Sequence, residues 1–295
     1  MTDLIDSLAA IPGQYDAVFC DLWGCLHNGK TAYPAAVEAL RAFKAKGGTV
    51  VLLTNSPRPA GSVESQIAGL NVPRDCWDDI VSSGDAAQYG LFSGAVGARV
   101  HHIGAPKDLT FFHDISPDLA PLAAAHPVTL VPLREAEGVV CTGLADDTTE
   151  TPDDYRAALL QMKANGLTML CANPDLIVDL GDRRLYCAGA LAAAYEDMGG
   201  TALYFGKPHP PIYDLARRRL TALTGKDDPR ILCIGDGVNT DVQGGQSEGL
   251  DTLFVTAGIA AHEFGTDANA PDKTLLAAWL AEKQQYATYA IPFLH

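Results

Sequence analysis

Short apolar segments alternate with amphipathic ones through most of this 295-residue chain. Ala17–Asp21 is a short apolar run that ends in an aspartate, and Thr49–Thr54 is apolar or β-branched throughout; both have the length of buried strands. Between them, Ala35–Lys46 has the periodicity of a helix that ends before two glycines. Strands and helices that alternate in this way form parallel sheets with crossover helices. The pattern therefore predicts a doubly wound α/β domain around a parallel sheet. The same reasoning predicts further helices near 61–69, 84–93, 153–164, 211–223 and 274–283, and further strands at 98–103, 139–142, 168–171, 202–205, 230–234 and 251–255.

The middle of the chain has a different character. Residues 98–186 contain weaker strands and proline-bearing loops around one clear helix. We expect this segment to form a smaller α/β domain inserted into a core made of residues 1–97 and 187–295. The apolar tail Ala290–His295 is expected to pack on the core, because a run of this kind is stabilised by burial.

Composition excludes several classes of partner. Hydrophobic residues make up 47% of the chain, which is enough for a sizeable core, and the net charge is −15. That charge argues against nucleic acid or an anionic membrane as the main partner. No apolar run approaches the roughly 18 residues of a membrane span, and the acidic start lacks the basic residues of a secretory signal. Seven cysteines, an odd number scattered through apolar runs, indicate reduced thiols, so a cytoplasmic protein is expected.

Two polar segments directly follow the first two predicted strands. Asp21 leaves a buried strand into a glycine-bearing loop, where a carboxylate must be paired, protonated or bound to a metal. Thr54, Asn55 and Ser56 follow the next strand and present small hydrogen-bonding groups that suit an anion. Taken alone, each segment is equally compatible with a capping turn.

Two more polar segments follow later strands. Lys207 lies between a strand and the start of a helix, where its ammonium can face a ligand, although a lone lysine there is usually a solvated surface residue. Asp236 and Asp241 lie five residues apart in a glycine-containing loop after Ile231–Ile234. Two carboxylates in such a loop form a hard oxygen site suited to Mg²⁺. The alternative is an aspartate-rich turn.

Together, in this order, the four segments resemble the motifs of the haloacid dehalogenase (HAD) superfamily. Further details resemble its class IIA branch, which includes p-nitrophenylphosphatase-like, phosphoglycolate, and sugar- or nucleotide-phosphate phosphatases. The resemblance covers nearly the whole chain, and it implies a Rossmann-like core with a cap domain inserted at 98–186. The segments that carry the class resemblance are Leu53–Asn55, Ala172–Asp175, Ala188–Leu191, Gly206–Pro208, Gly235–Asp236, Thr240–Asp241 and Leu253–Gly258.

The resemblance also implies a reaction centre. Asp21 would be the nucleophile and would form an aspartyl-phosphate. Mg²⁺ would be bound by Asp21, by the backbone carbonyl of Trp23 and by Asp236, with Asp241 bound directly or through water. Mn²⁺ stays an alternative, because hard oxygen sites accept both ions.

Other residues would bind a small phosphorylated substrate. By the same resemblance, Thr54 and the backbone of Asn55 would hold the phosphoryl oxygens, and Lys207 would neutralise the nucleophile and the phosphate. Such neutralisation makes physical sense, because phosphoryl transfer is catalysed chiefly by positioning and charge. Trp23 and Asn173 are the remaining candidates for contact with the substrate.

One position departs from the family pattern. Phosphatases of this superfamily carry a second aspartate two residues after the nucleophile, as general acid and base, and this chain has Trp23 there. Indole offers one N–H donor and cannot transfer that proton near neutral pH. Losing general acid–base help slows a reaction by roughly 10²–10⁴-fold. His27 and His209 are the nearest substitutes in sequence, and each is equally compatible with a structural hydrogen bond.

Several hypotheses therefore stay open. The first is a Mg²⁺-dependent phosphatase, and the second is a catalytically degenerate protein that binds a phosphorylated ligand. Dinucleotide binding is disfavoured because no G-x-G-x-x-G follows the first strand. A dehalogenase would leave the paired aspartates unexplained. Cys25 lies close enough in sequence to be a reactive thiol, and a strand-rich insertion allows a homodimer. The substrate cannot be ranked from the sequence.

Overall fold

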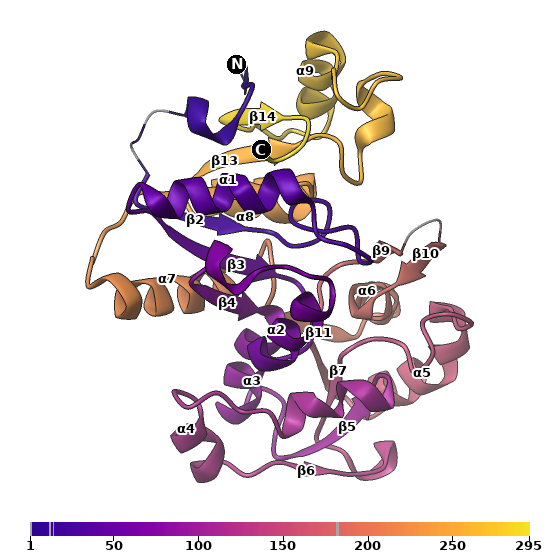
Figure 1. Ribbon diagram of the computed structural model, residues 1–295. Helices are drawn as coiled ribbons and strands as arrows, with labels where there is room; N and C mark the ends of the chain where they lie inside the picture. The colour runs from indigo at the N-terminus through magenta and orange to yellow at the C-terminus, as the bar shows by residue number, and fades with distance from the viewer. Residues whose placement is uncertain (1, 12, 14, 181–182) are drawn as a thin grey trace. The chain divides into compact units, whose positions relative to one another are not determined.

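The computed structural model describes residues 2–11, 13, 15–180 and 183–295, and the chain divides into two compact units. The first unit comprises Met1–Thr54, Ser65–Val81 and Tyr213–His295, and the second comprises Asn55–Glu64 and Ser82–Ile212. Each unit is built on a sheet of its own (Figure 1). Among the described helices, none combines the length and the apolar character that crossing a membrane requires.

The first unit contains a seven-stranded sheet with the order β1-β14-β13-β12-β2-β3-β4. In this order, each strand from β1 through β14, β13, β12 and β2 to β3 pairs in parallel with the next. The central strands β2 and β12 are buried along their whole length. Its strands are β1 (Asp3–Leu4), β2 (Ala17–Cys20), β3 (Thr49–Thr54), β4 (Asp79–Ser82), β12 (Ile231–Gly235), β13 (Asp251–Val255) and β14 (Tyr289–Ile291). Its helices are η1 (Leu8–Ala10), α1 (Pro34–Ala45), η2 (Arg74–Cys76), η6 (Val238–Val242), α8 (Gln243–Ser247), η7 (Ala261–Phe264) and α9 (Lys273–Glu282). The chain passes between the units at four points: between Thr54 and Asn55, within α2 (Ala60–Gly69), between Val81 and Ser82, and within α7 (Pro210–Thr224).

The strand order of this sheet reverses between β2 and β12. From β2 the chain moves through α1 to β3, whereas from β12 it moves through α8 to β13 on the other side. Right-handed crossovers that run in opposite directions place their helices on opposite faces of the sheet. The predicted doubly wound α/β fold is therefore confirmed. In such a sheet, ligands bind beyond the carboxyl ends of the strands at the point of reversal.

The C-terminal tail completes the first sheet. Strand β14 pairs in parallel with β13, and β1 adds to its other side. Ala290 and Ile291 are fully buried and Leu294 nearly so, which confirms the expectation that the tail packs on the core. The tail forms a strand as well, which the three-residue apolar segment did not reveal.

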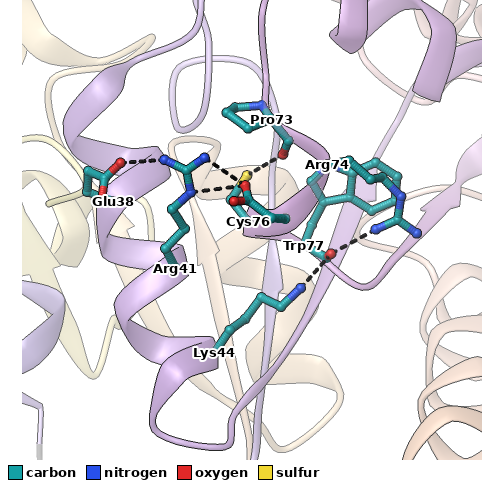
Figure 2. Close-up of polar contacts among 8 residues, drawn as sticks. Glu38, Arg41, Lys44, Pro73, Arg74, Cys76 and Trp77 are labelled. Carbon is teal, nitrogen blue, oxygen red and sulfur yellow. Dashed lines mark hydrogen bonds and ion pairs between the residues drawn. The ribbon is translucent and has the colours of Figure 1, made fainter.

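A polar network attaches the segment Pro73–Trp77 to helix α1 (Figure 2). The guanidinium of Arg41 donates hydrogen bonds to Glu38 in its own helix and to Asp75. Lys44 Nζ donates to the carbonyl of Trp77 at 2.7 Å. These contacts are largely at the surface, so their role is to fix the course of the chain more than to stabilise it.

The second unit has a five-stranded parallel sheet with the order β11-β8-β7-β5-β6 and a separate antiparallel hairpin of β9 and β10. Its strands are β5 (Arg99–Ile103), β6 (Thr129–Leu130), β7 (Gly138–Cys141), β8 (Thr168–Cys171), β9 (Ile177–Leu180), β10 (Arg183–Tyr186) and β11 (Thr201–Tyr204). Its helices are α3 (Ser83–Phe92), η3 (Pro106–Phe112), α4 (Ala120–Ala125), η4 (Leu133–Glu135), η5 (Pro152–Tyr155), α5 (Arg156–Ala164) and α6 (Ala188–Asp197).

Both faces of this second sheet are covered by helices. Val139 and Cys141 pack in a cluster with residues of α5 and α6, whereas Val140 packs in another with residues of α3 and η3. Successive side chains of a strand point to opposite faces, so β7 contributes to two hydrophobic layers. This explains why the strand is a continuous apolar run.

The second unit is larger than the insertion expected at 98–186. Strand β11, expected in the core, pairs with β8 of the second sheet instead, and helices α3 and α6 pack on the same sheet. A short apolar strand carries no mark of the sheet that it joins, so the sequence could not assign β11. The role of residues 98–186 as a cap stays a prediction.

Candidate active site

Asp21 and Asp236 lie at the carboxyl ends of two adjacent parallel strands of the first unit. Cys20 of β2 is in register with Ile234 of β12, and the amide of Asp21 donates to the carbonyl of Ile234 at 2.8 Å. Each aspartate is the first residue after its strand. Both therefore lie at the reversal of strand order, where a doubly wound sheet binds its ligand.

Potential metal ligands cluster at this edge. Oxygen atoms of Asp21 and Asp236 and the Sγ of Cys25 lie within 4.8 Å of one another. Asp236 and Cys25 are buried, with exposures of 5% and 1%. Two carboxylates held this close repel unless a cation or a proton lies between them. Burial, and then the charges of Asp236 and Asp21, raises the pKa of the Cys25 thiol well above its usual range. The two carboxylates supply hard oxygen donors of the kind that Mg²⁺ prefers, whereas the sulfur of Cys25 is a soft donor that suits other metals.

Asp236 is fixed by the loop that follows β13. The amide of Ile259 donates to Asp236 Oδ2 at 3.0 Å. A Cβ atom added at Gly24 or at Gly258 would overlap the same carboxylate. Gly24 also has a φ of 72°, in the region that favours glycine. The two glycines therefore leave the space that this carboxylate fills.

Asp241 occupies a short π-helix, Val238–Val242. Its carboxylate turns back toward the start of that helix and accepts from the amide of Gly237 at 3.1 Å. Asp241 is 5% exposed and stands outside the group formed by Asp21, Cys25 and Asp236. Single π-helical turns are rare and frequently occur at functional sites.

Thr54 is the last residue of β3, which lies beside β2 in the same sheet. The register pairs Cys20 with Leu52, so Thr54 lies at the same edge as Asp21. Its side chain is buried, with 3% exposure. Three of the predicted residues thus lie at the carboxyl ends of three adjacent strands: Thr54 at β3, Asp21 at β2 and Asp236 at β12.

The Trp23 indole packs within its own loop. Its ring meets the ring of His27 edge-on at 5.4 Å between centroids, and a Cβ on Gly29 would overlap the indole. The amide of Gly29 donates to His27 Nδ1 at 3.0 Å, so the proton of the neutral imidazole is on Nε2. Burial lowers the pKa of His27 to about 4. His27 is therefore neutral near pH 7 and lacks the proton that an imidazolium acid would deliver.

Three further predicted residues, Asn55, Asn173 and Lys207, belong to the second unit and are buried. The amide of Lys207 donates to Asn55 Oδ1 at 2.7 Å, and Asn55 Nδ2 donates to the carbonyl of Lys207 at 3.0 Å. Asn55 Nδ2 also donates to Asp175 Oδ1 at 2.8 Å. Asn173 Oδ1 in turn accepts from the amide of Asp175 at 3.0 Å. Asp175 belongs to the segment Ala172–Asp175 that carries the class resemblance, but its hydrogen bond to Asn55, 120 positions away, could not be predicted from residue type.

His209 follows Lys207 by two residues and stacks on Tyr204, with ring centroids 4.9 Å apart and planes at 11°. Burial lowers the pKa of His209 below its ordinary value. The stacking is a packing contact of this histidine within the second unit. A role of His209 as general acid stays a prediction.

Known proteins that are similar to this chain share its fold. The fold and the site define a Rossmann-like α/β protein with a carboxylate pair at its point of strand reversal. A family model for haloacid dehalogenase-like hydrolases matches residues 18–116, and a HAD-hydrolase-like model matches residues 204–281. A solved haloacid dehalogenase-like hydrolase from Brucella suis 1330 is 38% identical and superposes with a TM-score of 0.84, covering 99% of this chain and 100% of that one. The chain therefore belongs to the haloacid dehalogenase-like hydrolase family, as predicted.

Curated relatives are more distant. The ribonucleotide monophosphatase NagD of Escherichia coli K12 is 26% identical over 83% of this chain and 88% of its own length. An acid sugar phosphatase of Staphylococcus aureus is 25% identical over 88% of this chain and 93% of its own length. Both similarities extend over most of each chain, in agreement with the class IIA resemblance.

Proposed function

We propose that this protein is a Mg²⁺-dependent phosphatase of small phosphate esters that forms an aspartyl-phosphate on Asp21. The observation that carries the proposal is the approach of Asp21 and Asp236 to within 4.8 Å at the point of strand reversal. Relatives named as phosphatases of nucleotides and sugars support the same class of reaction. We further propose that the segment 98–186 acts as the cap that selects the substrate.

Mg²⁺ would be bound by Asp21, by Asp236 and by the backbone carbonyl of Trp23. Asp241, whose Oδ2 accepts from the amide of Gly237, would bind the ion directly or through water. When bound, the ion would neutralise the negative charge that otherwise keeps an anionic nucleophile away from an anionic phosphate.

The reaction consists of two displacements at phosphorus. An oxygen of Asp21 attacks, its bond to phosphorus forms, and the bond to the leaving oxygen breaks. Water then attacks the same phosphorus, releases inorganic phosphate and regenerates the carboxylate of Asp21. Thr54 and the Asn55 backbone would hold the phosphoryl oxygens, and Lys207 would neutralise charge in both steps. Asn173 would contact the remainder of the substrate.

Trp23 sets a condition on the substrate. The leaving oxygen receives no proton from this residue, so it must depart as an anion or take a proton from elsewhere. Acyl and aryl phosphates have leaving groups of low pKa and satisfy the condition without an acid. We therefore propose that such compounds are turned over faster than simple alkyl phosphates.

The test is release of p-nitrophenol from p-nitrophenyl phosphate, with Mg²⁺ and with a chelator. Wild type should be active only with Mg²⁺, and Asp21→Asn should lose activity by at least about 10³-fold. Asp227→Asn, at an exposed position of the same unit, is the matched control and should keep wild-type activity. Full activity of Asp21→Asn would refute the mechanism.

A second candidate function is binding of a phosphorylated ligand without turnover. The observation that favours it is the packing of the Trp23 indole against His27 and Gly29, in the place where a phosphatase needs a general acid. Calorimetry would support this function if it shows Mg²⁺-dependent binding of a phosphate ester while no product forms. Turnover of p-nitrophenyl phosphate by wild type would exclude it.

A further inference from the structure

We infer that Asn55 and Asp175 are positioning residues for Lys207. This inference rests on the proposed function, in which the Lys207 ammonium neutralises the phosphate. The hydrogen bonds that connect the three residues span 120 and 152 positions of sequence within one compact unit. They do not follow from any motif taken singly.

The side chain of Asn55 pairs with both polar groups of the Lys207 residue. Asn55 Oδ1 accepts from the Lys207 amide at 2.7 Å, and Asn55 Nδ2 donates to the Lys207 carbonyl at 3.0 Å. The exposures of the two residues are 4% and 3%, so water does not compete for these bonds. Buried polar groups need their partners, because a buried donor or acceptor that loses its partner is not compensated by water. The main chain of Lys207 is therefore held at two points by one amide group.

Asp175 fixes the orientation of that amide group. Its Oδ1 accepts from Asn55 Nδ2 at 2.8 Å, and an ionised carboxylate accepts hydrogen bonds but donates none. If the Asn55 amide were flipped, its oxygen would face the Asp175 carboxylate and its NH₂ would face the amide of Lys207. Both contacts would be repulsive, so the acceptor oxygen of Asp175 and the main chain of Lys207 favour the same orientation of the Asn55 amide. Asn173 holds Asp175 in place, since its Oδ1 accepts from the Asp175 amide.

Close packing at Gly206 also restricts the main chain next to Lys207. A Cβ atom there would lie 2.5 Å from Asn55 Oδ1, 2.6 Å from Ser83 Oγ and 2.7 Å from Pro174 Cδ. These distances are shorter than a carbon atom tolerates, so only glycine fits directly before Lys207. The main chain that carries the lysine is thus enclosed by side chains and hydrogen-bonded through Asn55.

Fixing the main chain of Lys207 limits the positions that its flexible side chain can reach. A lysine has four rotatable side-chain bonds, so its ammonium can be placed reproducibly only if its main chain is fixed. A displacement of about 1 Å in a reacting group can cost on the order of 10² in rate. Asn173, Asp175 and Asn55 are linked in this order by hydrogen bonds, and we call this chain of contacts the relay. We therefore expect the relay to affect phosphate binding and turnover by positioning Lys207.

The test uses near-isosteric variants. Asn55→Asp removes the NH₂ donor and sets two carboxylates against each other, and Asp175→Leu removes the acceptor. Each should lower kcat for p-nitrophenyl phosphate by about 10–100-fold and raise the inhibition constant of inorganic phosphate in parallel. Asp175→Asn keeps an acceptor oxygen and should retain activity within a few-fold. Asn165→Asp, an exposed change in the same unit, is the control.

Rescue separates positioning from general stability. If both roles were structural only, thermal midpoints would fall while the inhibition constant of phosphate in the folded fraction stayed unchanged. The double variant Asn55→Asp with Asp175→Leu should be no worse than the worse single variant, because both changes break the same relay. Additive losses, or unchanged phosphate inhibition in both single variants of an active enzyme, would overturn the inference and leave the proposed function standing.

Failure of the proposed function has a different signature. If wild type releases no p-nitrophenol, binding of inorganic phosphate is measured by calorimetry in the same set of variants. Weaker binding in Asn55→Asp and Asp175→Leu but not in Asp175→Asn would support the relay without catalysis. Equal binding in all variants, or none in wild type, would overturn it.

Discussion

The amide of Ile259 donates a hydrogen bond to Asp236 Oδ2 at 3.0 Å, although the two residues follow different strands of the first sheet. This bond fixes the rotation of the carboxylate about its last side-chain bond. The neighbouring Gly258 makes the contact possible, since any side chain there would occupy the space of the carboxylate. A candidate metal ligand is thus oriented by a loop that contributes no ligand of its own.

Gly258→Ala should weaken Mg²⁺ binding. The added Cβ forces the Asp236 carboxylate to move, and disturbing a group that orients a ligand typically weakens metal binding by roughly 10–100-fold. The Mg²⁺ concentration that gives half of the maximal rise in thermal midpoint should increase accordingly. Gly69→Ala is the control, because a Cβ at Gly69 meets nothing within 4 Å. Unchanged Mg²⁺ dependence in Gly258→Ala would show that the loop does not orient the ligand.

Restoring an acid at position 23 should favour poor leaving groups. Trp23→Asp is expected to speed hydrolysis of an alkyl phosphate by roughly 10²-fold or more relative to Trp23→Asn, with a smaller effect on p-nitrophenyl phosphate. The two variants lose the same packing against His27 and Gly29, so their ratio isolates the acid from the cavity. Equal rates for Asp and Asn on both substrates would mean that position 23 does not face the leaving group.

The native protein should be nearly inert toward thiol reagents. All seven cysteines are buried and none forms a disulfide. Thiolate is the reactive form, and burial disfavours it. We expect less than one thiol to react with an aromatic disulfide reagent in buffer, and seven after denaturation in guanidinium. Rapid reaction of one thiol in buffer, lost in Cys25→Ser, would instead revive the hypothesis of a reactive Cys25.

His102 should make stability depend on pH. Burial, and then the neighbouring His101, lowers the pKa of His102 in the folded protein to about 4, from an ordinary value of 6.5. Below pH 6.5 the unfolded chain binds a proton that the folded chain excludes, so the free energy of unfolding falls as pH drops from 6.5 toward 4. His102→Gln keeps a polar group near Thr142 but cannot titrate, and it should lose about 1–2 kcal/mol less than wild type between pH 7 and pH 5.

Urea unfolding at the two pH values measures this difference. The exposed His126→Gln is the control and should follow wild type. If His102→Gln lost as much stability as wild type between these pH values, the folded protein would have to accept the proton at His102 without penalty.

Much of the fold was accessible from the sequence because buried parallel strands are short apolar runs with polar ends. The expected segments 49–54, 168–171 and 251–255 coincide with β3, β8 and β13. The sequence could not assign β11 to its sheet, because Thr201–Tyr204 has the same apolar character as strands of the other sheet. Pairing partners are decided by contacts far apart in sequence.

The candidate site also contains some features that residue type predicts and others that it does not. Asp21 and Asp236 were predictable from carboxylates that follow apolar strands, since those strands lie at the reversal of strand order. The bond between Ile259 and Asp236 was not, because a backbone amide leaves no trace in residue type. Nor was the role of Asn55, whose partners lie more than 100 positions away.

One of the four points at which the chain passes between the compact units falls between Thr54 and Asn55, two consecutive residues of one motif. The second unit therefore does not correspond to one continuous stretch of sequence, because Asn55–Glu64 belongs to it together with Ser82–Ile212. A recombination event that exchanged residues 82–212 as one block would bring in a new Lys207 and Asp175 but would retain the old Asn55. Such an exchange would preserve the hydrogen bonds of Asn55 only if the new segment matched it at both partner positions.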